Sequence, residues 1–321
     1  MTLTAKILTP REEYIMDYPE AIEFAETQQS IFWLPDEIQV DKDVQDLQVN
    51  MNEAERHGVI TTLKLFTLYE LVAGNEYWGG KIVRNFKRPD IQRMANAFSF
   101  FEINVHAPFY NKLNEVLGLD TAEFYNDYVN DPDLSDRMEF IDEIVGSKQL
   151  PLSLLAFSMV EGAILYSSFA FLKHFQAQGK NMLNNVVAGI NFSVRDENLH
   201  AEAGAWLFRT LISELGREPE EFQEVANNVA KTILAHEEKI ISKIFERGAI
   251  TGITDHQMVE FVKSRLNLCL KNLGLEPLYE VKYNPISSWF YKGINSIQLH
   301  DFFYRVGNEY HRSWEEEGFK W

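Results

Sequence analysis

Four glutamates stand in segments of the sequence that are otherwise mostly apolar and have the spacing of helices. Glu70 lies in LKLFTLYELVAG, and Glu161 lies in AFSMVEGAILYSSFAF. Glu102 follows a mostly apolar run at 97–101, and Glu197 has apolar helical turns before and after it. An ionised carboxylate in such surroundings costs several kcal/mol unless it is paired or bound to a metal. Because lysine and arginine are scarce near these acids, the fold must give them a shared cationic partner.

Two histidines accompany these acids. His106 stands four residues after Glu102, and His200 stands three residues after Glu197, so each pair leaves its helix on one face. Taken singly, each residue has an ordinary explanation: a core histidine, or a glutamate at a helix rim or facing a buried arginine. Two metal ions explain all six residues together. Oxygen and imidazole ligands without thiolate favour iron or manganese over structural zinc, in the arrangement of ferritin-like carboxylate proteins.

Long segments with helical spacing dominate the chain, and no alternating strand pattern extends beyond a few residues. The 17 glycines and 10 prolines cluster between these segments. The expected long helices cover 53–86, 90–117, 152–178, 181–215, 219–247 and 255–273. His236, Glu237 and Glu238 form a charged stretch that we expect to be exposed. With no repeat or dividing linker, the pattern predicts an all-α, ferritin-like helical bundle at 51–300 with a dimetal-carboxylate site.

The two ends of the chain differ from this middle part. Residues 1–50 mix charged and bulky side chains, which predicts an N-terminal arm packed on the bundle. Residues 301–321 are polar but end in aromatics, so we expect a tail that docks on a partner protein, with Phe319 and Trp321 as anchors.

Charge, cysteine content and hydropathy exclude several classes of protein. Lys+Arg 30 against Asp+Glu 48 gives a net charge of −18, which argues against binding of nucleic acid. The single cysteine, Cys269, excludes an internal disulfide, a dithiol reductant and a zinc-thiolate site in this chain. The first residues lack an apolar secretory stretch, so we expect a cytoplasmic location. The segment 150–175 has the length of a membrane span, but Glu161 at its centre costs at least about 2.5 kcal/mol in lipid, which predicts a buried helix and no membrane contact.

The motifs HAPFY at 106–110, the segment 161–171 and RDENLH at 195–200 resemble the radical-generating small subunit of class I ribonucleotide reductase. The resemblance extends over 31–321. It implies that one metal is bound by Glu70, Glu102 and His106, and the other by Glu161, Glu197 and His200. It further implies two iron ions and a tyrosyl radical on Tyr110.

The residues around Tyr110 agree with that implication. Tyr110 stands one turn beyond His106 on the same helix face, which puts a phenol beside the metals. Phe109 and, from the Glu161 helix, Leu165, Tyr166 and Phe169 are available to exclude water. A tyrosyl radical needs such a dry pocket, whereas without the metal ligands plain core packing would explain Tyr110 better.

The resemblance also implies a route for the radical. Trp33 matches a tryptophan near the metal site, Asp196 matches an acid that hydrogen-bonds the ligand His106, and Tyr310 matches the tail tyrosine that passes the radical to the partner. An acid on a ligating imidazole fixes its tautomer and raises its basicity. The ordinary alternatives are an arm-to-core contact for Trp33, an ion pair of Asp196 with Arg195, and a solvated tail position for Tyr310.

Two features depart from the family pattern. Glu70 stands where many members have aspartate. A manganese pair, or a mixed iron and manganese pair, therefore remains an alternative to two iron ions. Three residues separate Glu102 from His106, where two are common, and Pro108 removes a backbone donor. These features predict a local π-type bulge, and regular α-helical geometry over 98–112 would contradict it.

The resemblance therefore implies that this chain is the small subunit of class I ribonucleotide reductase, which stores a radical for nucleotide reduction in a separate large catalytic subunit. By analogy with the family we expect a homodimer, and a flavodoxin-like activator if manganese is used. Two alternatives stay open. One is a ferritin-like dimetal oxidase or hydroxylase with its own substrate, and the other is an iron-storage protein of the ferritin type.

Overall fold

The computed structural model describes residues 5–281 and 284–291, and every regular element in this part of the chain is a helix. The main helices are α1 Pro19–Ser30, α2 Glu53–Leu71, α3 Val83–Asn85, α4 Pro89–Phe101, α5 Ala107–Leu117, α6 Ala122–Asn130, α7 Pro132–Gly146, α8 Leu150–Ala163, α9 Tyr166–Lys173, α10 Asn184–Glu214, α11 Gln223–Ile244 and α12 Asp255–Asn272. Short 3₁₀ turns are η1 Lys6–Leu8, η2 Pro35–Glu37, η3 Val40–Asp43, η7 Ala177–Gly179 and η8 Pro219–Phe222. Three π-helical segments are η4 Asp46–Asn50, η5 Val72–Ile82 and η6 Glu102–His106. The predicted all-α class is confirmed.

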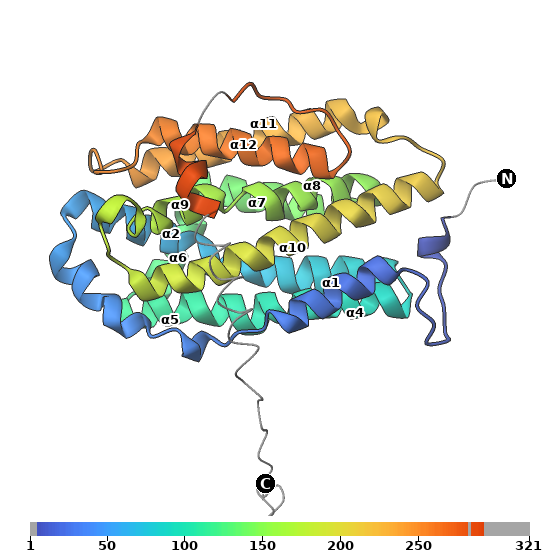
Figure 1. The fold of residues 1–321 in the computed structure, drawn as a ribbon, viewed down its shortest axis with the longest axis horizontal. Coiled ribbons are helices and arrows are strands. Elements are labelled where there is room, and N and C mark those ends of the chain that lie inside the picture. The colour runs from blue at the N-terminus through green and yellow to red at the C-terminus, as the bar shows by residue number, and fades with distance from the viewer. Residues whose placement is uncertain (1–4, 282–283, 292–321) are drawn as a thin grey trace, which may run out of the picture.

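The helices form a layered bundle (Figure 1). Helices α11 and α12 lie side by side along one side, α8 and α10 pack along each other through the middle, and α1 packs on α4 along the opposite side. The segment Leu150–Lys173 is long and apolar enough to cross a membrane, but its apolar window is fully buried inside the bundle. It forms the two core helices α8 and α9, so the burial that the sequence analysis predicts is confirmed.

The predicted bulge is confirmed, because Glu102–His106 is π-helical between α4 and α5. The other two π-helical segments, Asp46–Asn50 and the longer Val72–Ile82, were not predicted, and Val72–Ile82 interrupts the helix expected over 53–86. The sequence analysis also missed α1, α6 and α7.

The helix expected over 152–178 is interrupted after Ala163 and ends at Lys173, so that prediction was wrong in part. Two buried arginines take the carbonyl groups that the break sets free. Arg137 Nη2 donates to the Ile164 carbonyl at 3.0 Å, and Arg265 Nε donates to the Gly162 carbonyl at 3.0 Å. Side chains far away in sequence thus stabilise a break that local periodicity does not reveal.

The expectation of an exposed stretch at 236–238 was wrong for Glu237, whose side chain is fully buried. Glu237 Oε1 lies 3.6 Å from Arg137 Nη1, and Glu237 Oε2 accepts a hydrogen bond from Ser167 Oγ at 2.5 Å. The periodicity of α11 places this acid on the inner face, where Arg137 offsets part of the cost of burial.

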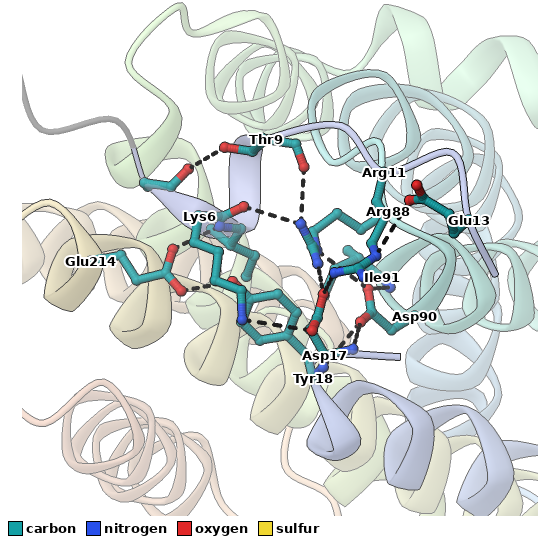
Figure 2. A network of polar contacts seen from close by, with 12 residues as sticks. Lys6, Thr9, Arg11, Glu13, Asp17, Tyr18, Arg88, Asp90, Ile91 and Glu214 are labelled. Carbon is teal, nitrogen blue, oxygen red and sulfur yellow. Dashed lines mark hydrogen bonds and ion pairs between the residues drawn. The ribbon is translucent and has the colours of Figure 1, made fainter. Parts of the chain in front are cut away.

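A polar network fixes the chain before α1 to the bundle (Figure 2). Asp17 pairs with Arg11 and Arg88, and the Asp90 carboxylate accepts hydrogen bonds from the backbone amides of Asp17 and Tyr18 at 2.8 and 3.0 Å. The start of α1 is therefore held against the start of α4.

The predicted tail at 301–321, with Tyr310, Phe319 and Trp321, lies outside the described residues.

Candidate metal centre

The structure brings the six predicted metal ligands together in the centre of the bundle. All six side chains are at most 2 % exposed. They come from four helical segments: Glu70 from α2, Glu102 and His106 from η6, Glu161 from α8, and Glu197 and His200 from α10. Since η6 packs against α2 and α8 packs against α10, segments distant in sequence meet at one point.

Their ligand atoms form two groups, and within each group all atoms lie within 4.8 Å of one another. The first group is Glu70, Glu102, His106 and Glu197, and the second is Glu102, Glu161, Glu197 and His200. Glu102 and Glu197 therefore belong to both groups. The family resemblance implies one metal for each of them, whereas the geometry gives both the position of a bridging carboxylate.

Many of these atoms have no hydrogen-bond partner. Both carboxylate oxygens of Glu70 and of Glu197, together with Oε1 of Glu102, Oε2 of Glu161 and Nδ1 of His200, are buried and unpartnered. His200 Nδ1 lies 2.6 Å from Glu102 Oε1, yet the two atoms are not aligned as a hydrogen bond. In the described part of the chain, the ion pairs of the four glutamates all involve histidine. Orphaned oxygens that converge without lysine or arginine fit two bound cations.

The pKa values of the four glutamates show the effect of burial without a nearby lysine or arginine. Burial and then the neighbouring carboxylates raise the pKa values of Glu70 and Glu161 well above the usual range. Burial raises the pKa of Glu197 to about 8. Burial also acts on Glu102, but the charges of the two histidines outweigh it and hold the pKa of Glu102 well below its usual value. Four carboxylates this close need either protons or metal ions.

His106 is oriented by a buried acid, as the sequence analysis expects. Its Nε2 lies 3.1 Å from Asp196 Oδ2, and Trp33 Nε1 donates to the same oxygen at 2.8 Å. His106 Nε2 donates this hydrogen bond to the Asp196 carboxylate, and Nδ1 is the ring nitrogen that faces the glutamates, 3.1 Å from Glu102 Oε2. Asp196 Oδ1 also lies 3.9 Å from Arg195 Nε, so the ion pair named as the alternative is present as well.

Two further side chains next to the centre were missed. Gln28, on α1, is fully buried and its Oε1 lies 2.9 Å from His200 Nε2, so an amide orients this histidine as Asp196 orients His106. Trp78, in the π-helical segment η5, donates from Nε1 to Glu161 Oε1 at 3.0 Å. A polar residue on the inner face of an amphipathic α1 would have pointed to Gln28, but the π-helical register of Trp78 gives no local signal.

Tyr110 lies in the dry pocket that the sequence analysis predicts. Its ring is fully buried and stacks on Phe66, with ring centroids 4.3 Å apart, and Phe66 in turn stacks on Phe169 at 5.4 Å. Phe109 is 5.1 Å away by centroid. The Tyr110 hydroxyl has no hydrogen-bond partner, and burial followed by the charge of Glu70 raises the pKa of Tyr110 well above its usual value.

Comparison with known proteins identifies the family. A family model described as "Ribonucleotide reductase, small chain" matches residues 12–285 of this chain, which is most of its length and includes all six candidate ligands. The chain belongs to the ribonucleotide reductase small-chain family.

Relatives of this small chain extend over most of both sequences. It is 28% identical to the ribonucleoside-diphosphate reductase subunit beta of Treponema pallidum over 319 residues, which covers 93% of this chain and 87% of the relative. The corresponding subunit of Bacillus subtilis is 25% identical over 294 residues, with 88% and 86% covered. A probable small subunit from Invertebrate iridescent virus 3 is 24% identical over 320 residues, with 92% and 82% covered.

Solved structures share the fold of this small chain. A putative class I ribonucleotide reductase from Bacillus halodurans matches with a TM-score of 0.75 at 20% identity, covering 88% of this chain and 99% of the other. The dimanganese(II)-NrdF of Streptococcus sanguinis matches with a TM-score of 0.75 at 21% identity, covering 89% and 99%. The ferritin-like bundle expected from the sequence is therefore the observed fold.

Proposed function

We propose that this chain is the radical-generating subunit of a ribonucleoside-diphosphate reductase and that its radical resides on Tyr110. The observation that carries the proposal is a cluster of four buried glutamates and two histidines, rich in unpartnered atoms, beside a buried phenol in an apolar pocket. The proposed ligands are Glu70, Glu102, His106, Glu161, Glu197 and His200. A metal pair held there and oxidised by an oxygen species would supply the oxidising power for removing one electron from Tyr110.

The chain's own residues have separate roles in this proposal. Tyr110 gives up its electron together with its hydroxyl proton, and the unpartnered oxygens of Glu70 are candidate acceptors for that proton. Phe66 stacks on the Tyr110 ring and Phe169 stacks on Phe66, so both help to exclude water, which protects an unpaired electron from reductants. Burial and the charge of Glu70 raise the pKa of Tyr110, so the phenol carries its proton before oxidation.

The same proposal assigns the radical route to Trp33, Asp196 and His106, continued by Tyr310. The first three are connected by hydrogen bonds of 2.8 and 3.1 Å, and the rings of Trp33 and His106 are 6.0 Å apart by centroid. Tyr310 belongs to the tail at 301–321, which lies outside the described residues. We infer that this tail docks on the large catalytic subunit, where the ribonucleotide is reduced.

The metal and the partners are part of the proposal. Two iron ions are the first choice for an oxygen and imidazole ligand set, and manganese or a mixed pair is the alternative. A manganese pair is named in the related Streptococcus sanguinis protein, which supports that alternative. If manganese is used, we propose a flavodoxin-like activator as a further partner. We propose a cytoplasmic homodimer.

Electron paramagnetic resonance with elemental analysis tests the radical assignment. Protein loaded with iron or manganese and then oxidised is expected to contain two metal ions per chain and to show a tyrosyl signal. Tyr110→Phe should keep the metal and lose the signal. A signal that persists unchanged in Tyr110→Phe would place the radical elsewhere.

A truncated chain separates the proposal from its main rival. Deletion of 308–321 should abolish binding to the large subunit and nucleotide reduction while metal loading and the radical signal are retained. A stand-alone dimetal oxidase would not need this tail, so unchanged activity after the deletion favours the rival.

A further inference from the structure

Within residues 5–281 and 284–291, Trp78 is the only tryptophan whose indole donates a hydrogen bond directly to a candidate metal ligand. Trp33 donates to Asp196, which is not a candidate ligand. The ring of Trp78 is fully buried, and Nε1 lies 3.0 Å from Glu161 Oε1. The ring also lies edge-on to Phe98 and to His200, with centroids 4.8 and 6.0 Å apart. Trp78 therefore contacts Glu161 and His200, whereas Trp33 lies beside His106.

The π-helical segment Val72–Ile82 is what places Trp78 there. A π-helix has more residues per turn than an α-helix, so side chains after Glu70 leave the helix in a different direction from the α-helical one. Three glycines permit this geometry. A Cβ on Gly74 would lie 2.6 Å from Ile103 and 2.9 Å from Glu102, and Cβ atoms on Gly79 and Gly80 would meet carbonyl oxygens five residues earlier at 2.9 and 2.6 Å.

The surroundings of this segment hold it in register. Ser99 Oγ donates to the Gly74 carbonyl at 2.9 Å, so a carbonyl of the π-helical segment has a partner from α4. Trp78 also packs edge-on against Tyr77 at 5.0 Å, and Tyr77 stacks on Phe157 of α8, the helix that carries Glu161. The indole is thus fixed against the same helix as the carboxylate to which it donates.

The four glutamates differ in how many oxygens remain unpartnered. Glu70 and Glu197 each have two, whereas Glu102 has only Oε1 and Glu161 has only Oε2. The partner of Glu102 Oε2 is His106, itself a candidate ligand, but the partner of Glu161 Oε1 is Trp78, which is not one. We propose that Trp78 is a positioning residue that occupies one oxygen of Glu161 and so leaves this glutamate a single oxygen for the metal pair. Glu161 would then offer only one oxygen to the ion held with His200. In this respect the ion held with His200 would differ from the ion held with His106.

This inference rests on the proposed metal site, and one titration separates the two. Metal-free full-length protein is titrated with Mn²⁺, and the free ion is followed by electron paramagnetic resonance. Wild-type protein should bind two ions. Trp78→Phe, which removes the N–H, should bind one of the two about 10–100-fold more weakly, the usual cost of losing a partner of a metal ligand.

Two further variants separate the hydrogen bond from packing. Replacement of Trp78 by 3-benzothienylalanine keeps the bicyclic ring and removes only the N–H, so it should weaken the same ion by the same factor and decides the matter if Trp78→Phe does not fold. Tyr77→Phe is the matched control, because the Tyr77 hydroxyl is buried without a partner, and it should bind both ions normally. A crystal structure of the Mn²⁺-loaded benzothienyl variant should show both Glu161 oxygens turned toward metal.

The outcomes are distinct. If wild-type protein and the benzothienyl variant bind both ions equally well, the role of Trp78 is refuted and the proposed function stands. If Tyr77→Phe weakens the same ion as strongly, packing and not the indole N–H is responsible, and the inference again fails. If wild-type protein binds no metal, the proposed function fails first.

Discussion

Glu237 gives a prediction whose size follows from the structure. The side chain is fully buried near Arg137, and burial raises the pKa of Glu237 from 4.5 to about 7 against the opposing effect of Arg137. Because the folded state then holds a proton that the unfolded state has lost, the contribution of Glu237 to stability is complete below pH 4.5 and is lost as the pH rises through about 7. At about 1.4 kcal/mol for each tenfold change in proton affinity, the loss is about 3 kcal/mol.

Glu237→Gln removes this dependence, because the amide resembles the protonated acid and still accepts from Ser167. The variant should match wild-type stability near pH 4 and exceed it by about 3 kcal/mol near pH 9. Urea unfolding of metal-free protein between these pH values measures the difference. Glu238→Gln, at an exposed position on the same helix, is the control and should follow the wild-type profile. Parallel profiles for wild-type protein and Glu237→Gln would refute the reasoning.

Three other substitutions test the packing, a buried charge and the second histidine. Phe66→Ala should lower the free energy of unfolding by about 3–5 kcal/mol, because its fully buried ring stacks on Tyr110; a loss below about 1 kcal/mol in urea unfolding would contradict the packing described. Burial lowers the pKa of Lys173 from 10.5 to about 7, so the folded state binds fewer protons than the unfolded state between these values and stability rises with pH. Lys173→Met should abolish that rise in thermal unfolding, and an unchanged rise would assign it to other groups. Gln28→Leu should weaken the ion bound by His200 about 10–100-fold in a Mn²⁺ titration, and equal affinity would show that the amide does not orient the imidazole.

The sequence was informative wherever the signal is local. Helical spacing predicted the long helices, and the isolated glutamates in apolar segments predicted a buried cluster. The extra residue between Glu102 and His106, followed by Pro108, predicted the π-helical segment that the structure contains. Each of these inferences depends on residues within a few turns of one another, where backbone geometry fixes the relation between side chains.

The errors and omissions have a common physical cause. The break after Ala163 is stabilised by Arg137 and Arg265, which come from α7 and α12. The burial of Glu237 depends on the same Arg137. Neither could be inferred from the neighbours of Ala163 or Glu237 in the sequence, because the compensating charge arrives only when distant helices pack.

The sequence by itself predicted a helical bundle with six candidate metal ligands in its interior, because apolar periodicity and uncompensated acids favour that arrangement. Only the tertiary structure decided which of those side chains lie together and which neighbouring residues orient them. It placed Glu102 and Glu197 in both ligand groups, set Gln28 behind one histidine and Asp196 behind the other, and brought Trp78 to one oxygen of Glu161. These relations join residues of different helices, and their distances are fixed by packing, which no single segment encodes.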